Sequence, residues 1–207
     1  MKGIGVLISG GGTNLQALID KVESGYIPAS INVVVSNKKD AYGLKRAEAY
    51  GIPTAVISKK DYKDEREFSK ALIDVLDKYK VDLVVLAGYL SILSPDIVDR
   101  YKNRIINIHP SLIPAFCGKG YYGEKVHKAV LDYGVRVTGA TVHFVDYGTD
   151  TGPIILQRPV MVEQDDDVSS LAKRVLKVEH ELLPEAVKLW VEGRLRIEGR
   201  KVIINSI

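Results

Sequence analysis

The chain has 207 residues, which is enough for one α/β domain with a sizeable core. Two full domains would need a longer chain. Apolar residues make up 46% and charged residues 27%, the composition of an ordinary globular protein. The net charge of +3 comes from scattered Lys and Arg, which argues against a nucleic-acid-binding arm and agrees with small anionic ligands. No apolar run approaches the ~20 residues that span a bilayer, and we expect no signal peptide.

The first half alternates apolar, β-rich runs with amphipathic stretches. Strands are predicted at residues 3–9, 31–36, 54–57, 82–87 and 105–109. Helices are predicted at residues 13–24, 42–50, 64–79 and 95–101. Runs such as VVLA and VLIS are apolar throughout, as in strands covered on both faces. This pattern predicts an α/β fold with a doubly wound, mainly parallel sheet and flanking helices, whose ligands bind beyond the carboxyl ends of the strands.

The pattern changes after residue 134. Residues 135–145 and 153–162 form two β-rich runs, which predict an antiparallel C-terminal portion. A long helix is predicted from about 168 to 192, followed by a strand or hairpin at 194–204. Pro184 lies inside that helix and is expected to kink or split it.

A glycine-rich segment, Ser9-Gly10-Gly11-Gly12-Thr13-Asn14, joins the first strand to the first helix. Glycines let the backbone approach a ligand, and helix N-terminal amides attract an anion. The third glycine of the dinucleotide fingerprint is replaced by Leu15, and the Lys of a nucleotide P-loop is absent. The segment therefore fits a phosphate or carboxylate cradle, or else a tight turn capped by Thr or Asn.

Asn107 and His109 lie two apart at the end of the fifth predicted strand and would share one face. An amide beside an imidazole can bind a carbonyl oxygen that becomes negative during attack. A loop distant in sequence, 146–152, holds Asp146 and Asp150, which are either turn formers or partners of a histidine. An ionised Asp near His109 would raise the pKa of the imidazole above its reference value of about 6.5.

Five segments occur in this order along the chain: SGGGTNLQALI, SNKKDAYGLKRA, LAGYLSILSP, INIHPSLIP and TVHFVDYGTDTGPIILQ. Together they resemble the glycinamide ribonucleotide transformylases, a branch of the folate-dependent formyltransferase superfamily. The resemblance covers nearly the whole chain. It implies one formyltransferase domain over residues 1–207, with a phosphate-binding half to about residue 100 and a folate and catalytic half beyond it.

The resemblance also implies a role for each matching residue. Asn107 and His109 would contact the formyl group, and Asp150 would keep His109 charged. The ribonucleotide would be held by Gly12, Thr13, Asn14 and Glu179. The folate pocket would be lined by Arg66, Leu90, Ser91, Ile92, Leu93 and Asn107. Independently, Glu179 interrupts an apolar seam at helical spacing, so we expect it to be partly buried and to need a partner.

Two positions depart from the family pattern. Related enzymes often carry Arg at the position of Ser91, so one side-chain contact to folate is expected to be absent or supplied elsewhere. Cys117 replaces a commoner Pro or Lys, and we interpret this single cysteine as structural because nothing beside it activates a thiolate. A lone free thiol also suits the reducing cytoplasm.

The expected reaction is direct transfer of the formyl group from 10-formyltetrahydrofolate, as cosubstrate, to the amine of glycinamide ribonucleotide. The partners would be small molecules, without nucleic acid, membrane or metal, since His127, His143 and His180 show no ligand spacing. Proton transfer through Asp150, His109 or water stays open, as does the choice between a monomer and a weak homodimer. The alternatives are an enzyme like methionyl-tRNA formyltransferase or formyltetrahydrofolate hydrolase, and a non-catalytic sensor of phosphate ligands.

Overall fold

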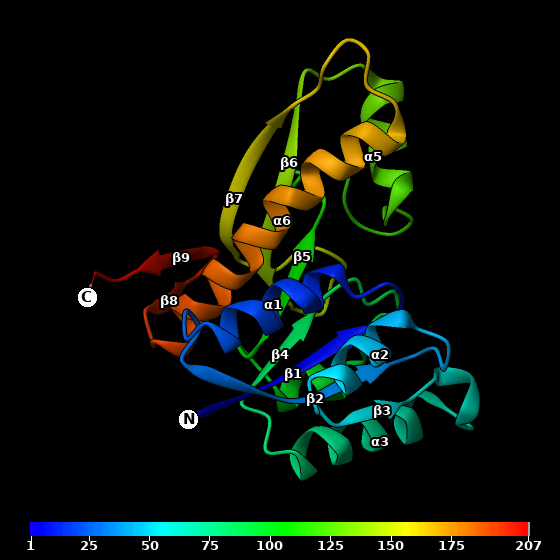
Figure 1. The fold of residues 1–207 in the computed structure, drawn as a ribbon, viewed down its shortest axis with the longest axis vertical. Helices are drawn as coiled ribbons and strands as arrows, with labels where there is room; N and C mark the ends of the chain where they lie inside the picture. Colours follow the sequence, from blue (N-terminus) through cyan, green and yellow to red (C-terminus); the bar gives the residue numbers. More distant parts are fainter. Residues whose placement is uncertain (207) are drawn as a thin grey trace. The chain divides into compact units, whose positions relative to one another are not determined.

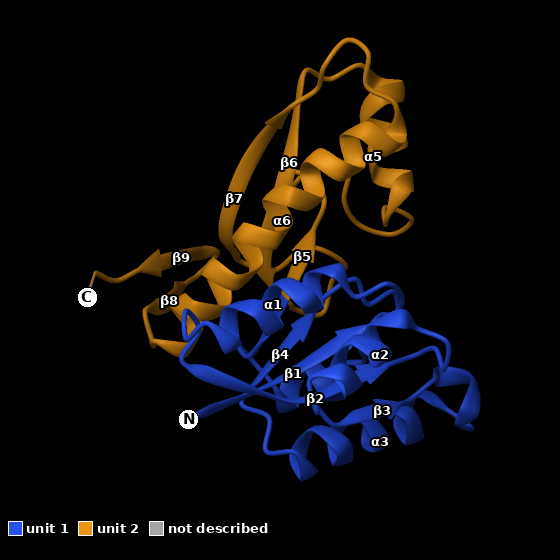
Figure 2. Ribbon diagram, viewed as in Figure 1, with its two compact units in different colours: residues 1–106 blue, residues 107–207 orange. Residues whose placement is uncertain are grey.

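The computed structural model describes residues 1–206, which fall into two compact units, residues 1–106 and the described residues from 107 onward (Figure 2). Each unit is an α/β arrangement in its own right. The strand β5 (Ile105–His109) begins in the first unit and ends in the second. Whether both units form one domain stays a prediction.

The first unit is built on a parallel sheet with the strand order β3-β2-β1-β4. Its strands are β1 (Lys2–Ile8), β2 (Ala29–Ser36), β3 (Thr54–Val56) and β4 (Leu83–Leu86). Its helices are α1 (Thr13–Glu23), α2 (Tyr42–Ala49), α3 (Glu65–Lys78) and α4 (Pro95–Arg100), with the short 3₁₀ helix η1 (Lys59–Asp61) before α3.

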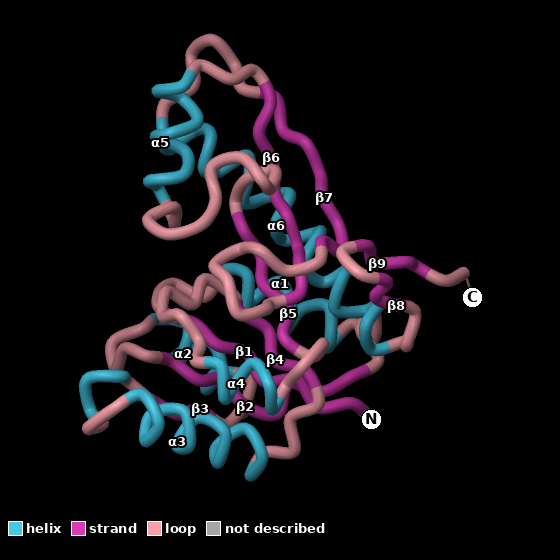
Figure 3. Tube along the Cα trace, turned by 180° about the vertical axis from the view of Figure 1, so that it is seen from behind, coloured by secondary structure: helices cyan, strands magenta, loops and turns pink. Residues whose placement is uncertain are grey.

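The helices of the first unit cover both faces of its sheet. The chain runs outward from β1 through β2 to β3 and returns to β4, so right-handed crossovers place α1 and α2 on one face and α3 and α4 on the other (Figure 1 and Figure 3). All four residues of β4 are buried, as its apolar run predicts. The doubly wound, parallel arrangement is therefore confirmed.

The second unit carries the antiparallel portion, in the order β6-β7-β9-β8. The strands are β6 (Val137–Phe144), β7 (Ile154–Met161), β8 (Leu195–Glu198) and β9 (Lys201–Ile204). The pairs β6–β7 and β8–β9 are antiparallel, which confirms both the predicted pair and the C-terminal hairpin. The helices are α5 (Glu124–Tyr133) and α6 (Val168–Val191), and α6 packs against β6, β7 and α5.

The helices differ from the sequence prediction in two ways. Pro184 does not split α6, which runs through it for 24 residues. A proline costs the helix one N–H bond, and here the ring is buried in the packed face of α6, whose apolar contacts offset that loss. The helix α5 was not predicted at all, although Val126 and Val130 have helical spacing and Gly134 ends it in the left-handed conformation (φ 81°) that favours glycine.

Candidate active site

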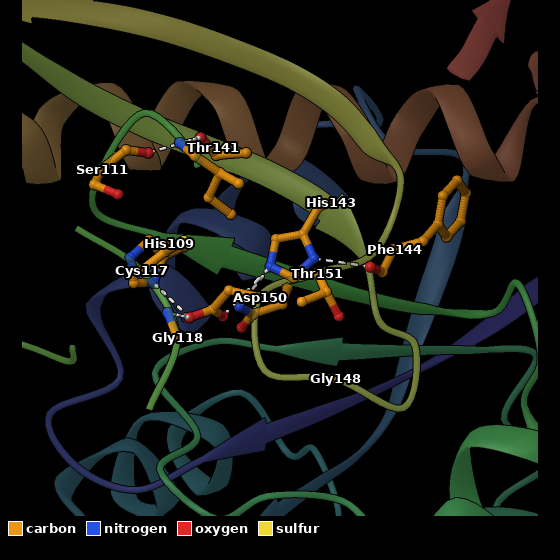
Figure 4. Close-up of polar contacts among 12 residues, drawn as sticks. His109, Ser111, Cys117, Gly118, Thr141, His143, Phe144, Gly148, Asp150 and Thr151 are labelled. Carbon is orange, nitrogen blue, oxygen red and sulfur yellow. Dashed lines mark hydrogen bonds and ion pairs between the residues drawn. The ribbon is translucent and has the colours of Figure 1, made fainter. Parts of the chain in front are cut away.

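His109 is the last residue of β5 and is only 4% exposed. Its Nε2 lies 2.9 Å from the carbonyl oxygen of Phe116, which can only accept, so Nε2 carries a proton and donates it. Its Nδ1 lies 3.6 Å from Oδ2 of Asp150. The predicted neighbourhood of His109 and Asp150 is therefore present, and Figure 4 shows both side chains grouped with His143.

The loop between β6 and β7 separates the roles of its two acids. Asp146 forms the turn: its Oδ1 accepts from the amide of Gly148 (3.1 Å) and from the hydroxyl of Thr151 (2.5 Å). Asp150 instead adopts a left-handed backbone (φ 57°) with only 10% of its side chain exposed. Its Oδ2 accepts from the amide of Gly118 at 2.9 Å. The turn-former interpretation thus holds for Asp146 and fails for Asp150.

His143 stands between Asn107 and Asp150. Its Nδ1 donates to the carbonyl oxygen of Phe144 at 2.8 Å, so in the neutral ring Nε2 is the acceptor. The amide Nδ2 of Asn107 lies 3.1 Å from that Nε2, and Oδ1 of Asp150 lies 3.7 Å from it. With Nε2 as the acceptor, the amide nitrogen of Asn107 points toward the histidine, and the second hydrogen on that nitrogen is left for another acceptor.

The charges of this cluster differ from expectation. Burial lowers the pKa of His109 from its ordinary value, and it outweighs the upward effects of Asp150 and of the Phe116 carbonyl. For Asp150, burial acts to raise the pKa, but His143, the charge of His109 and the Gly118 amide together bring it below its ordinary value. The prediction of a raised pKa for His109 is therefore wrong, because the desolvation of the imidazolium outweighs the charge of Asp150. At neutral pH the pair is a neutral imidazole beside a carboxylate.

A buried hydrogen-bond network holds the loop that follows His109. Oγ1 of Thr141, on β6, donates to the carbonyl oxygen of Ser111 (2.6 Å) and accepts from the amide of Ile113 (3.1 Å). Gln157, on β7, donates through Nε2 to that same Oγ1 and to the carbonyl oxygen of Ile113, both at 2.9 Å. Two adjacent strands thereby anchor the loop whose next residues, Phe116 and Gly118, contact His109 and Asp150. Figure 4 shows Gly118 beside Asp150 and Thr141 beside Ser111.

The glycine-rich loop of the first unit begins α1 without a side-chain cap. The N-cap is Gly12, with φ 70° and ψ 33°, and no side chain bonds the first-turn amides there. The capped-turn alternative is therefore wrong. Thr13 is exposed and Asn14 is buried, so the loop offers a hydroxyl and backbone amides at a helix N-terminus, which suits an anion.

The segment expected to line the folate pocket also lies in the first unit. Leu90 and Ile92 are 53% and 61% exposed, which is unusual for such large apolar side chains, whereas Leu93 is buried. The amide of Leu90 donates to Oγ of Ser9 at 2.8 Å, and Oγ of Ser91 accepts from Nδ2 of Asn37 at 2.7 Å. Arg66, in the first turn of α3, is exposed.

Two further expectations concern single residues of the second unit. Glu179 is 8% exposed on α6, so the carboxylate within an apolar seam is buried, as its spacing predicts. Cys117 donates through Sγ to the carbonyl oxygen of Pro114 at 3.3 Å, and burial followed by the charge of Asp150 raises the pKa of its thiol. A raised pKa disfavours the thiolate and agrees with a structural Cys117.

Sequence reasoning missed the residues that act through backbone groups or long-range bonds: Phe116, Gly118, Thr141 and Gln157. Their only signal is proximity in sequence to the resembling segments INIHPSLIP, TVHFV and PIILQ. Within residues 1–206, no group of His, Cys, Asp and Glu is arranged to hold a metal ion. No helix of that range has the length and apolarity to cross a membrane.

The known proteins that match this chain have names that refer to a formyl group, either as transferases or as a deformylase. A family model described as formyl transferase matches residues 2–187. Phosphoribosylglycinamide formyltransferase of Haemophilus influenzae is 43% identical over 206 residues, covering 100% of this chain and 95% of that protein. Glycinamide ribonucleotide transformylase 1 of Symbiobacterium toebii superposes with a TM-score of 0.95 and 48% identity, covering 100% of this chain and 95% of that one. A formyltetrahydrofolate deformylase of Pseudomonas syringae also matches, with a TM-score of 0.89 and 27% identity, over 99% of this chain and 66% of that one.

Proposed function

Because the chain belongs to the formyl transferase family, we propose that it transfers the formyl group of 10-formyltetrahydrofolate to the amine of glycinamide ribonucleotide, a step of purine synthesis. The observation that carries this proposal is the cluster in which buried His109 faces the carboxylate of Asp150, while His143 links the amide of Asn107 to the same carboxylate. The names of the full-length relatives support the choice of the ribonucleotide as acceptor.

Asn107 and His109 are proposed to bind the formyl oxygen. The neutral His109 holds its proton on Nε2, where the carbonyl of Phe116 now accepts it at 2.9 Å. The formyl oxygen would replace that carbonyl as the acceptor, and the second amide hydrogen of Asn107 would provide another bond. Donors of this kind stabilise the tetrahedral oxyanion, and loss of one costs about 3–4 kcal/mol of barrier.

Proton movement follows from the charges. The substrate amine attacks the formyl carbon, a C–N bond forms, and the amine then loses one proton. The growing oxyanion and Asp150 both favour positive charge on His109, so its pKa rises during the reaction from the low value that burial imposes. The amine proton then moves to N10 of the folate, through Asp150, His109 or a bound water, as the bond between N10 and the formyl carbon breaks. Holding both substrates together supplies much of the remaining rate.

The other roles follow the resemblance. Gly12, Thr13 and Asn14 would bind the phosphate, and Glu179 would bind the glycinamide end of the ribonucleotide. Arg66, together with Leu90, Ser91, Ile92 and Leu93, would line the folate pocket. Exposure of Leu90 and Ile92 supports this, because bound folate would cover them. Asn37 holds the hydroxyl of Ser91, so we assign Ser91 a bond within the protein rather than a bond to folate. We propose that the enzyme works in the cytoplasm on small molecules.

A folate-release assay tests the proposed function. Tetrahydrofolate formation from 10-formyltetrahydrofolate is followed spectroscopically with and without glycinamide ribonucleotide. We expect release that requires the ribonucleotide and disappears in His109→Ala, while Thr138→Val, a buried change on β6, keeps wild-type activity. Release without any amine would instead make the chain a hydrolase, and phosphate-ligand binding without any release would make it a sensor.

A further inference from the structure

The carbonyl oxygens of all three loop glycines are bonded to neighbouring helices. The oxygen of Gly10 accepts from the amide of Gly43 at 3.0 Å, and the oxygen of Gly11 accepts from Nε of Arg46 at 2.8 Å. Both donors belong to α2. The oxygen of Gly12 accepts the first helical bond of α1, from the amide of Gln16 at 2.9 Å.

Fixed carbonyls determine where the loop amides point. In a planar trans peptide, the C=O of one residue and the N–H of the next point in opposite directions. The three bonds therefore turn the amides of Gly11, Gly12 and Thr13 away from the helices that hold the carbonyls. Within residues 1–206, none of these three amides donates to a protein acceptor. The loop thus directs its carbonyl oxygens toward the helices and its amide groups away from them, and such a set of amides can bind an anion.

Arg46 is held as a brace rather than left as a free charge. Besides its bond to Gly11, its Nη1 donates to Oε1 of Gln16 at 3.2 Å. Its guanidinium carbon lies 5.1 Å from the centroid of the Tyr42 ring. The side chain is half-buried, and three protein groups on α1, α2 and the loop fix its position.

The close contact between α2 and the loop depends on two glycines. A Cβ on Gly12 would lie 2.6 Å from Cα of Gly43, and a Cβ on Gly43 would lie 2.4 Å from Cδ1 of Ile8. Only without these atoms can α2 approach closely enough for Arg46 and the Gly43 amide to reach the loop carbonyls. The glycines and the arginine therefore serve one arrangement.

We propose that Arg46 is a positioning residue for the phosphate of the substrate: by holding the carbonyl of Gly11, it keeps the loop amides preorganised for a phosphate monoester. The proposal rests on the proposed function in that it takes the loop as the phosphate site. It adds that affinity for the phosphate is set from α2, by a residue that does not contact the ligand.

The test measures phosphate-ester binding apart from catalysis. Binding of ribose 5-phosphate to the full chain is measured by calorimetry without folate, for wild type, Arg46→Met and Arg46→Lys. Arg100→Met is the matched control, since it removes an arginine of the same unit that bonds Asp77 instead of the loop. We expect about tenfold weaker binding for Arg46→Met, equivalent to about 1.4 kcal/mol, and a loss of about threefold for Arg46→Lys. The control should bind as wild type does.

Kinetics separates positioning from a general structural effect. In Arg46→Met, the KM for the ribonucleotide should rise in parallel with the dissociation constant, while kcat and the KM for folate stay within about twofold of wild type. Gly43→Ala keeps Arg46 but pushes α2 off the loop, and it should weaken ribose 5-phosphate binding as well. Wild-type affinity in Gly43→Ala, together with loss in Arg46→Met, would overturn bracing in favour of direct charge attraction.

The remaining outcomes also discriminate. Unchanged affinity in Arg46→Met overturns the inference. If Arg46→Met fails to fold by circular dichroism, Arg46→Lys decides, and wild-type affinity there overturns the inference. Wild-type binding of ribose 5-phosphate without formyl transfer, with the predicted loss in Arg46→Met, would remove the proposed function and leave the brace standing. No binding of ribose 5-phosphate by wild type would overturn the inference even in an active formyltransferase.

Discussion

Nε2 of His109 donates a hydrogen bond to the carbonyl oxygen of Phe116. The N–H group that is proposed to bind the formyl oxygen is therefore occupied by the loop that follows His109. Phe116 reaches this position with a left-handed backbone, φ 49°, which is unfavourable for a residue with a side chain. A substrate oxygen that replaces the carbonyl would also let that residue relax. Formyl-group binding and rearrangement of the segment near Phe116 are therefore coupled in the proposed mechanism.

The protonation state of His109 gives the first prediction. Burial lowers its pKa, so a titration of the ring by NMR should give a value below 6.5 for the free protein. Asp150 opposes that shift, so the same titration in Asp150→Asn should give a still lower value. A pKa above 7 in the wild-type protein would contradict the neutral starting state, and with it the sequence of proton transfers proposed above.

Asp150→Asn should also separate turnover from binding. The carboxylate faces His109 and His143 and bonds the amide of Gly118, while the proposed phosphate ligands belong to α1 and its loop. We expect kcat to fall at least a hundredfold, because charge on His109 is no longer stabilised, with the KM for the ribonucleotide within about threefold of wild type. Steady-state kinetics decides this, and turnover like that of wild type would remove Asp150 from the mechanism.

Two threonines on β6 provide a matched test of the network beneath the site. Thr141→Val removes the acceptor of the buried Ile113 amide, and an unpaired buried group costs about 1–3 kcal/mol. Thr138 is equally buried, but its Oγ1 has no hydrogen-bond partner among residues 1–206, so Thr138→Val should be neutral or slightly stabilising. Urea unfolding gives both free energies. Equal losses in the two variants would show that the network adds nothing beyond packing.

The comparison of sequence and structure shows which kind of information each holds. The apolar run of β4 and the alternation of strands and helices predict the first unit because burial on two faces leaves a local pattern. Arg46, Thr141 and Gln157 escape prediction because their bonds join residues 16 to 44 positions apart, and such bonds leave no period in the sequence. The direction of the pKa shift of His109 escapes prediction for a related reason: a nearby Asp can be inferred from a motif, but the depth of burial cannot.

The backbone of Gly12 gives a third variant test. Gly12 and Gly25 both have a positive φ, 70° and 74°, but a Cβ on Gly25 meets nothing within 4 Å. Gly25→Ala should therefore show the conformational cost alone, about 1–2 kcal/mol. Gly12→Ala should cost more, since its Cβ meets Cα of Gly43 at 2.6 Å, and only this variant should weaken binding of ribose 5-phosphate. Equal unfolding free energies would contradict the close contact with α2.

The last prediction concerns the stability of the protein in acid, which depends on His127 on α5. It is 5% exposed, and no described residue forms a hydrogen bond with its Nδ1. Burial lowers the pKa of His127 against the upward effect of Glu124, and the nearby His109 lowers it further. A lowered pKa means that the unfolded chain binds the proton first as the pH falls.

The contribution of His127 to stability is therefore complete above pH 6.5 and is lost as the pH falls from there through the pKa of the folded state. His127→Leu removes the titrating group, so the free energy of unfolding should fall less between pH 7 and pH 5 in this variant than in wild type. Urea unfolding at each pH gives both curves, and His109, whose pKa is also lowered, accounts for part of the slope that stays. Parallel curves would mean that His127 has the same pKa in the folded and unfolded states, and that burial does not destabilise its protonated form.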